Sequence, residues 1–167
     1  MNKKSVILLL IMLLTGLISI FLVLSKKPAV KDQVFSGESA YQFVLEQTKY
    51  GPRTPGSLSH QLTRKMIVDK LTEFGWTVEM QKAVADGHDI YNIIARHQST
   101  GPITLLGAHY DSRLLASEES CLAHADQAVP GANDGASGVA VLLELARTLP
   151  LPTASQVELV FLDAEDQ

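Results

Sequence analysis

The chain has 167 residues, of which 46% are hydrophobic, 14 are lysine or arginine and 18 are aspartate or glutamate. This length suits about one domain. The excess of acidic side chains argues against nucleic acid or an anionic membrane surface as a partner, because both repel negative charge.

The N-terminal segment contains a long apolar run. Residues 6–24 carry no charged side chain, and a pair of lysines lies on each side of them. As a helix this run would reach about 28 Å, close to the thickness of a bilayer core. One interpretation is an uncleaved signal anchor, a transmembrane helix over residues 1–27. The alternative is a cleavable signal peptide, although no small-residue cleavage site follows the run.

Lysines on both flanks leave the orientation of this helix open under the positive-inside rule. Because short N-terminal tails usually stay in the cytoplasm, we expect the remaining chain to be membrane-anchored and extracytoplasmic. If the segment is cleaved, the remainder would be secreted. Residues 28–38 are polar and are predicted to form a tether. The single cysteine, Cys121, forms no internal disulfide, so it does not indicate the redox compartment.

Two helices are predicted after the tether, over residues 39–50 and about 59–74, because apolar residues recur there at helical spacing. The sequence GPRTPGS, residues 51–57, separates them with two prolines and two glycines. Gly75 lies where the second helix is expected to stop.

Beyond Gly75 the pattern changes to strands, followed by a long loop, a helix and a last strand. A helix between two apolar strands is typical of a crossover unit whose parallel strands are buried on both faces. The sequence therefore predicts an α/β domain with a mostly parallel sheet flanked by helices. Strands are expected over residues 76–84, 89–97 and 102–112. A loop over residues 113–133, a helix over residues 135–149 and a last strand over residues 156–163 follow them.

Polar side chains lie at the ends of two of these strands and at the start of the helix between them. His109 and Asp111 follow one strand, Asp134 precedes the helix, and Glu165 and Asp166 follow the last strand. Ligands of such domains bind beyond the carboxyl ends of the strands, so we expect these side chains to converge. Gathered carboxylates need a compensating cation, and His with Asp and Glu suits zinc. The pattern predicts a metal site.

Each residue also has a simpler interpretation. His109 alone could be a turn residue, Asp134 could be a helix N-cap, and residues 163–166 could form a solvated loop. Asp111 lies on the same side of an extended backbone as His109 and could orient its ring, or could be a turn residue. Asp163 has no firm role. The metal site is favoured because the segments after the two strands and the segment before the helix all belong to one crossover unit.

Three segments, GAHYDSR, VPGANDGASGVAVLLELARTL and VELVFLDAED, resemble the zinc aminopeptidase family that includes the animal-type glutaminyl-peptide cyclotransferases. GPRTPGS and the helix after it resemble the N-terminal region of that family. The resemblance covers about residues 39–167. It implies the N-terminal part of a zinc-dependent peptidase-type domain, a partial phosphorylase/hydrolase-like sandwich.

The resemblance also implies roles for particular residues. His109, Asp134 and Asp166 would be zinc ligands, Glu165 would be the general base, and Asp111 would hold His109 in place. Asp134 would bridge two zinc ions in an aminopeptidase or bind one in a cyclase. Asp166 stands where the family often has Glu, which shortens its reach by one methylene. An exchange of roles between Glu165 and Asp166 stays open.

The function implied first is a zinc-dependent aminopeptidase that hydrolyses the N-terminal peptide bond of peptides. The alternative is a glutaminyl-peptide cyclotransferase, in which Glu165 would shuttle a proton from the amine of an N-terminal glutamine. A third possibility is a non-enzymatic relative that keeps the fold for binding.

By the family pattern, each zinc would need one more ligand from beyond Gln167. The last strand would also lack a neighbour in the sheet, which is an aggregation hazard. We therefore expect the chain to be the first half of an enzyme, either a fragment or a truncated gene product, and to be inactive alone.

Overall fold

The structure is a computed structural model that describes Met12, Thr15 and residues 34–85, 87–97, 101, 103–116 and 126–166. The chain divides into two compact units, Met1–Lys31 and Asp32–Gln167, and the elements below belong to the second. Apart from Met12 and Thr15, the predicted anchor lies outside the described residues. Among the residues that the structure describes, every helix is too short or too polar to span a bilayer.

Two helices follow one another at the start of the second unit, each preceded by a serine. In α2 (Gly37–Thr48), the Ser36 hydroxyl accepts the Ser39 N–H at 3.2 Å. In α3 (Leu58–Glu73), the Ser57 hydroxyl accepts the His60 N–H at 3.1 Å. Such N-caps satisfy N–H groups that a helix leaves unpaired. Both predicted helices are confirmed, with ends that differ by no more than two residues.

Helix α4 (Ala136–Thr148) is the crossover helix expected between the last two strands, and a short α5 (Leu151–Ala154) follows it. A Cβ built on Gly138 would lie 2.9 Å from the Cβ of Ala108. The missing side chain therefore lets α4 pack closely against the strand before it. Close packing here positions the start of α4 beside the end of that strand.

The sheet has four strands in the order β1-β2-β4-β3. They are β1 (Thr77–Ala85), β2 (His88–Arg96), β3 (Thr104–His109) and β4 (Val157–Leu162). Strand β2 pairs antiparallel with both β1 and β4, and only β3 and β4 are parallel. The prediction of a mostly parallel sheet is therefore wrong for the described strands. The connection between β1 and β2 is too short for a crossover and makes an antiparallel hairpin.

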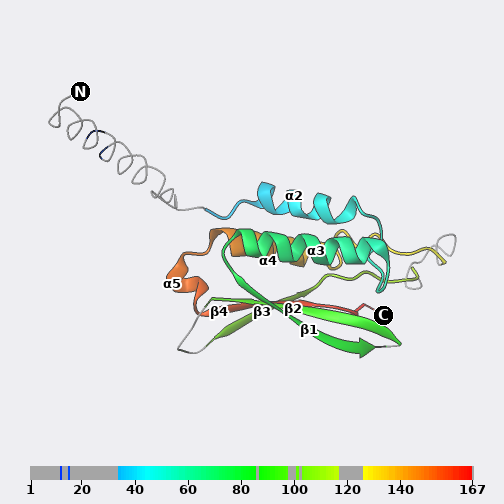
Figure 1. Cartoon of the computed structure of the whole chain (residues 1–167). Helices are drawn as coiled ribbons and strands as arrows, with labels where there is room; N and C mark the ends of the chain where they lie inside the picture. The colour runs from blue at the N-terminus through cyan, green and yellow to red at the C-terminus, as the bar shows by residue number, and fades with distance from the viewer. Residues whose placement is uncertain are drawn as a thin grey trace, which may run out of the picture. The chain divides into compact units, whose positions relative to one another are not determined.

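Strand β4 lies between β2 and β3, so the expectation that the last strand lacks a neighbour is also wrong. The open edges of the described sheet belong to β1 and β3. Figure 1 shows α2, α3 and α4 on the same side of this sheet, with α2 outermost. The α/β class and the flanking helices are confirmed, while the sheet itself is mixed.

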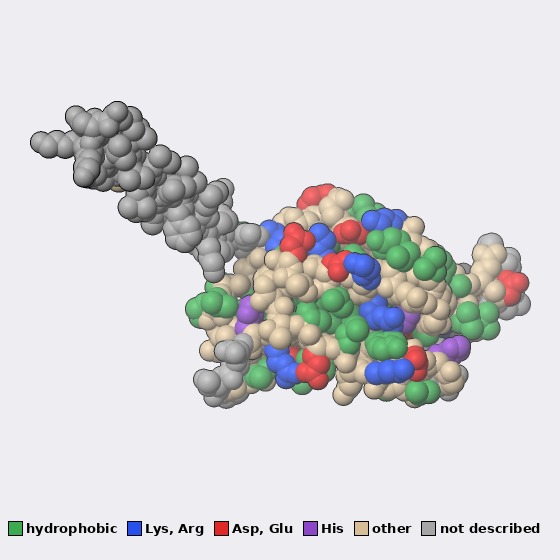
Figure 2. Space-filling model, in the orientation of Figure 1, with side chains coloured by type: hydrophobic (Ala, Val, Ile, Leu, Met, Phe, Trp, Pro, Cys, Tyr) green, Lys and Arg blue, Asp and Glu red, His purple; other side chains and the backbone are tan. Residues whose placement is uncertain are grey.

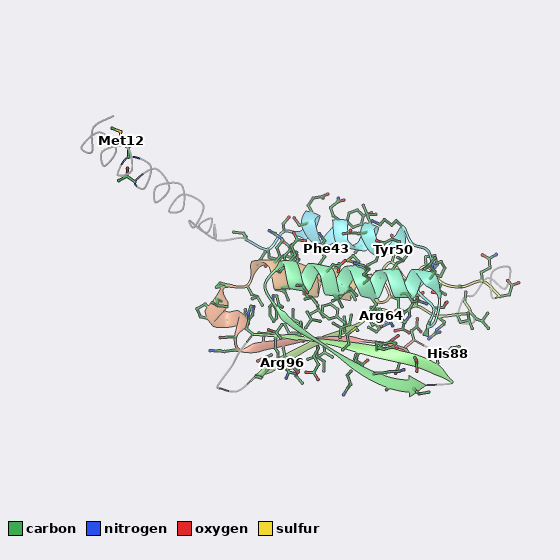
Figure 3. The ribbon with its side chains drawn as sticks, viewed as in Figure 1. Met12, Phe43, Tyr50, Arg64, His88 and Arg96 are labelled. Atoms are coloured by element: carbon green, nitrogen blue, oxygen red, sulfur yellow. The ribbon has the colours of Figure 1, made fainter. Side chains whose placement is uncertain are left out.

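The core fills the space between α3, α4 and the sheet, where Figure 3 shows side chains from both layers meeting. Ile67, Leu143, Ile93 and Phe161 are fully buried there. Each such side chain stabilises the fold by about 1.5–3 kcal/mol through burial. The indole N–H of Trp76 donates to the Ala146 carbonyl at 2.9 Å, which satisfies the one polar atom of that ring.

The outer surface of the helices is charged. Figure 2 shows acidic and basic side chains next to one another on the visible face. On α3, Lys65 pairs with Asp69 and Lys70 pairs with Glu73, at 2.5 and 3.2 Å. These exposed pairs contribute little to stability, and they keep the outer face of the helix polar.

Candidate metal centre

The crossover unit brings the candidate residues to one edge of the sheet. In the parallel register of β3 and β4, His109 lies opposite Leu162. The segments that follow these residues therefore leave the sheet side by side, and the Tyr110 N–H donates to the Leu162 carbonyl at 2.9 Å. The expected convergence of the two strand ends is confirmed.

His109 and Asp134 contact each other directly. Nε2 of His109 lies 2.9 Å from Oδ1 of Asp134, whose side chain is 67% exposed. The N-cap of α4 is Gly135, and no side chain caps the helix. The interpretation of Asp134 as an N-cap is therefore wrong, because its carboxylate turns to the imidazole instead.

Gly135 makes this contact possible. Its φ of 81° lies in the left-handed region that favours glycine. A Cβ at this position would lie 2.8 Å from the carbonyl oxygen of Asp111 and 3.1 Å from Cε1 of His109. Only a glycine lets the backbone before α4 approach the end of β3 this closely.

Asp111 is fully buried and holds two parts of the site. Its Oδ1 lies 3.3 Å from Nδ1 of His109. Its two carboxylate oxygens also accept the backbone N–H groups of Glu165 and Asp166, at 3.2 and 3.1 Å. Hydrogen bonds to an ionised carboxylate are stronger than neutral ones, so Asp111 fixes the turn after β4 as well as the imidazole.

Glu165 and Asp166 occupy different environments although they are neighbours. Ala164 adopts a left-handed φ of 55°, and the Glu165 side chain after it is 58% exposed, with Oε2 3.9 Å from Nδ1 of His109. Asp166 is buried, and its Oδ1 accepts a hydrogen bond from Nε of Arg113 at 2.7 Å. Glu165 therefore lies near the His109–Asp134 pair, whereas the carboxylate of Asp166 faces Arg113.

Asp163, which had no role in the sequence analysis, is the centre of a buried polar cluster. Its Oδ1 lies 2.6 Å from Nε2 of His60, and its Oδ2 accepts the Tyr110 hydroxyl and the Tyr91 N–H, both at 2.7 Å. Burial alone would raise the pKa of Asp163, but hydrogen bonds from His60, Tyr91 and Tyr110 outweigh burial and lower it. Burial and the adjacent Asp163 raise the pKa of the Tyr110 phenol.

The role of His60 was not predicted from the sequence either. A usable signal was present, since His60 precedes Thr63, Ile67 and Leu71 at helical spacing on the buried face of α3. A histidine in such a stripe needs a polar partner inside the fold. The partner, Asp163, lies 103 positions away in the sequence, and no local pattern identifies it.

Arg53, from the GPRTPGS segment, is a further buried polar residue whose role was not predicted from the sequence. Its Nε donates to the carbonyl of Tyr110 at 3.0 Å, and its two terminal nitrogens donate to the carbonyls of Pro130 and Gly131, both at 2.7 Å. Burial lowers the pKa of Arg53, and the carboxylates of Asp111 and Asp134 oppose that shift. The guanidinium joins the end of β3 to the loop before α4.

The His109–Asp134 pair fits a zinc ion in donor type and spacing. In a tetrahedral site, a nitrogen and an oxygen ligand stand about 3.4 Å apart. Their present separation of 2.9 Å would have to widen only slightly, and exposed Asp134 can move. Asp166 does not fit where it stands, because it would first have to leave Arg113. Among the described residues, no three His, Cys, Asp or Glu side chains gather closely enough to hold a metal ion.

The chain is similar to a peptidase family, to glutaminyl cyclases and to a Zn-dependent exopeptidase. Residues 92–167 match the sequence profile of peptidase family M28. A glutaminyl-peptide cyclotransferase of Drosophila melanogaster is 29% identical over 127 residues, 69% of this chain and 33% of the relative. The crystal structure of the Tannerella forsythia glutaminyl cyclase is similar with 34% identity and a TM-score of 0.72, over 80% of this chain and 48% of that one.

The crystal structure of a Zn-dependent exopeptidase from Parabacteroides distasonis is also similar. It has 33% identity and a TM-score of 0.73, over 81% of this chain and 49% of the exopeptidase. The chain thus spans about half the length of the two solved structures and a third of the fly relative.

Proposed function

We infer the function of this chain from its relation to peptidase family M28, which confirms the resemblance to the zinc aminopeptidases and glutaminyl cyclases. We propose that it forms the N-terminal part of a zinc-dependent exopeptidase that hydrolyses the first peptide bond of peptides. The observation that carries this proposal is the contact between His109 and Asp134, at 2.9 Å, beside the exposed carboxylate of Glu165.

In this proposal His109 and Asp134 hold zinc, which when bound supplies Lewis-acid activation of water and of the peptide carbonyl. Glu165 accepts the proton of the attacking water and delivers it to the leaving amine. Its exposure and its place beside His109 support this role. Asp111 keeps Glu165 in position through the backbone N–H of that residue.

Asp166 is the proposed ligand that the geometry supports least. Its carboxylate is buried against Arg113, so binding a metal requires the ion pair to open or Arg113 to move. The number of zinc ions, one or two, depends on whether Asp166 takes part.

The second candidate function is cyclisation of an N-terminal glutamine, which releases ammonia. The specific observation in its favour is that the fly relative and the T. forsythia structure are a glutaminyl-peptide cyclotransferase and a glutaminyl cyclase. In this reaction Glu165 would move a proton from the attacking amine to the leaving amide nitrogen.

The two functions are separated by mass spectrometry of a peptide that begins with glutamine, incubated with zinc-loaded protein. The assay uses the 167-residue chain and, where the gene encodes a longer protein, that protein too. Loss of the first residue supports the exopeptidase, and loss of ammonia supports the cyclase. Glu165→Gln should abolish either product, whereas the matched change Glu38→Gln, at an exposed position on α2, should not. If the longest form of the protein neither removes the first residue nor releases ammonia, the proposed function is wrong.

We further propose that residues 6–24 anchor the chain in a membrane and that the second unit lies outside the cytoplasm. The support is the uncharged run with lysines on both flanks. Carbonate extraction of cell membranes should leave the chain in the pellet, and protease added outside the cell should digest residues 32–167. Release of the chain by carbonate would contradict anchoring.

A further inference from the structure

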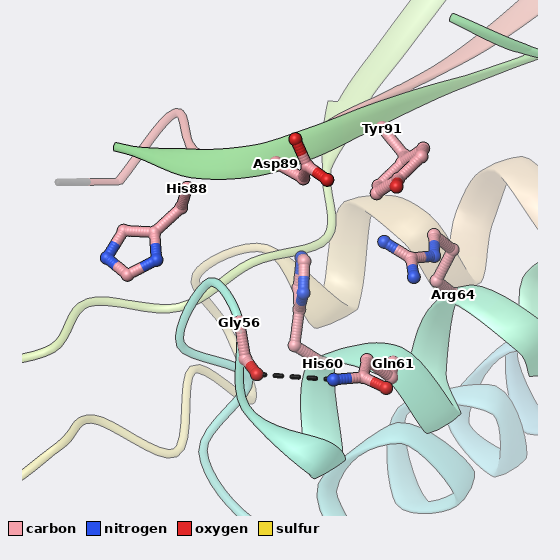
Figure 4. Close-up of a pocket in the computed structure, with 7 residues that line it drawn as sticks. All are labelled: Gly56, His60, Gln61, Arg64, His88, Asp89 and Tyr91. Carbon is pink, nitrogen blue, oxygen red and sulfur yellow. Dashed lines mark hydrogen bonds between the residues drawn. The ribbon is translucent and has the colours of Figure 1, made fainter. Parts of the chain in front are cut away.

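A polar pocket lies between α3 and the start of β2, and none of its lining residues belongs to the His109 site (Figure 4). Its volume is about 290 Å³. This volume is at the lower end for small-molecule sites, which suits a ligand of a few heavy atoms. The side chains that line it are His60, Gln61 and Arg64 of α3 and His88, Asp89 and Tyr91 of β2.

Arg64 gives the pocket an oriented positive charge. It extends from α3 towards β2, and its guanidinium lies beside Tyr91 (Figure 4). Its guanidinium carbon lies 4.2 Å from the centre of the Tyr91 ring, which is cation–π stacking distance. It also interacts with the neutral Tyr110 hydroxyl. Within the described part of the chain, Arg64 has no carboxylate partner.

The one carboxylate in the pocket lining is already balanced. Asp89 pairs with Nζ of Lys82 at 2.7 Å, and both side chains are about half exposed. The negative charge of Asp89 is therefore neutralised by Lys82, which is not part of the pocket lining. The positive charge of Arg64 is not neutralised by Asp89. The pocket also adjoins the first turn of α3, where the helix dipole is positive.

His60 provides a second and independent observation. Its ring stands between Arg64 and His88 in the pocket wall (Figure 4). Nε2 is bonded to Asp163, whereas the buried Nδ1 has no partner among the described residues. A buried polar nitrogen without a partner is uncommon in folded proteins, and a water, an ion or a ligand group bound next to it is one explanation.

We propose that this pocket binds one carboxylate group of a small organic acid or of a short peptide, with Arg64 as its main donor. A planar guanidinium presents paired N–H groups that match the two oxygens of a carboxylate. Stacking on Tyr91 holds the guanidinium plane in one orientation before the ligand arrives. The bond from His60 to Asp163 connects this pocket with the turn that carries Glu165. The proposal is independent of zinc and of the activity proposed above.

The test measures ligand binding to the whole chain at constant ionic strength, by calorimetry and by the midpoint of thermal unfolding. Succinate should bind saturably and raise the midpoint, because a ligand that binds only the folded state stabilises it. Succinamide, which has a similar size and no charge, should do neither. Glycylglycine and its amide form the second pair of ligands. Tighter binding of succinate would favour a small organic acid as the source of the carboxylate, and tighter binding of glycylglycine would favour a short peptide.

Two variants locate the site. Arg64→Gln should weaken succinate binding at least about tenfold, as expected for the loss of a charge-assisted bidentate contact. The matched control is Lys65→Gln, which removes a positive charge from the next residue of α3 but outside the pocket lining, and should leave affinity unchanged. If Arg64→Gln does not fold, amide NMR of the parent replaces it, and succinate should shift the signals of Gln61 and His88.

Four results would overturn the proposal. The first is equal binding of succinate and succinamide, and the second is unchanged succinate affinity in Arg64→Gln. The third is a set of succinate-induced NMR shifts that leaves Gln61 and His88 unaffected. Binding of sulfate as tight as that of succinate would also refute the assignment to a carboxylate.

Discussion

Replacing Asp111 with asparagine is expected to destabilise the chain strongly although the two side chains have almost the same shape. The Asp111 carboxylate is buried and accepts the N–H groups of Glu165 and Asp166, at 3.2 and 3.1 Å. An asparagine has one oxygen that can accept, so the second N–H would face an amide NH2 group, which is also a donor.

The expected loss follows from these two contacts. A hydrogen bond to a charged group contributes about 1.5–3 kcal/mol, and a buried donor left without a partner costs about 1–3 kcal/mol. Because the asparagine oxygen keeps one of the two bonds, we expect Asp111→Asn to lower the free energy of unfolding by about 2–4 kcal/mol.

Urea unfolding of the whole chain, followed by circular dichroism in a mild detergent, measures this loss. The control is Asp134→Asn, the same chemical change at a side chain that is 67% exposed. It should change the unfolding free energy by less than about 0.5 kcal/mol. Hydrogen exchange of the Glu165 and Asp166 amides should also accelerate in Asp111→Asn. Equal stabilities of the two variants would refute the assignment of Asp111 as the group that holds the turn.

Three further predictions concern the same part of the molecule. Gly135→Ala should lower the free energy of unfolding by about 1–3 kcal/mol, because φ is 81° and its Cβ would lie 2.8 Å from a backbone oxygen. Gly37→Ala, where a Cβ meets open space, should not, and equal effects in urea unfolding would contradict the steric argument. The pKa of Asp163 is lowered in the folded state, so its stabilisation is present above the unfolded pKa of about 3.9 and is lost as pH falls through the lower folded value. The stability difference between the parent and Asp163→Asn should therefore shrink at acid pH, and a difference that is constant down to acid denaturation would be inconsistent with this linkage. Finally, His109→Ala should weaken zinc binding at least about tenfold in competition with a chromophoric chelator, whereas His88→Ala should not.

The parts of the fold that local sequence determines were predictable. The helix after residue 135 and the apolar runs on either side of it define a crossover unit, and the order of elements then brings His109 and Asp134 to one edge. The contact between these two side chains follows from that topology. Asp134 contacts the imidazole instead of capping the helix because of the backbone conformation of Gly135. The positive φ of Gly135 could not be predicted from residue propensities.

The parts that depend on distant residues were not predictable from local pattern. The pairing of β2 with β4 joins residues more than 60 positions apart, and it decides that the sheet is mixed. The same limit applies to the His60–Asp163 pair and to the ion pair between Arg113 and Asp166. Each of these side chains has an ordinary local context, and only the assembled sheet brings its partner within reach.

The hydrogen bonds of Arg53 also set an order of events during synthesis. Its carbonyl acceptors lie 57, 77 and 78 positions further along the chain. At a translation rate of roughly 5–20 residues per second, the GPRTPGS segment is made about 4–16 seconds before its last partner. During that interval the guanidinium stays solvated and α3 has no sheet to cover. The edge that carries His109 and Asp134 therefore closes late in biosynthesis, when an early-made loop finally meets the residues it joins.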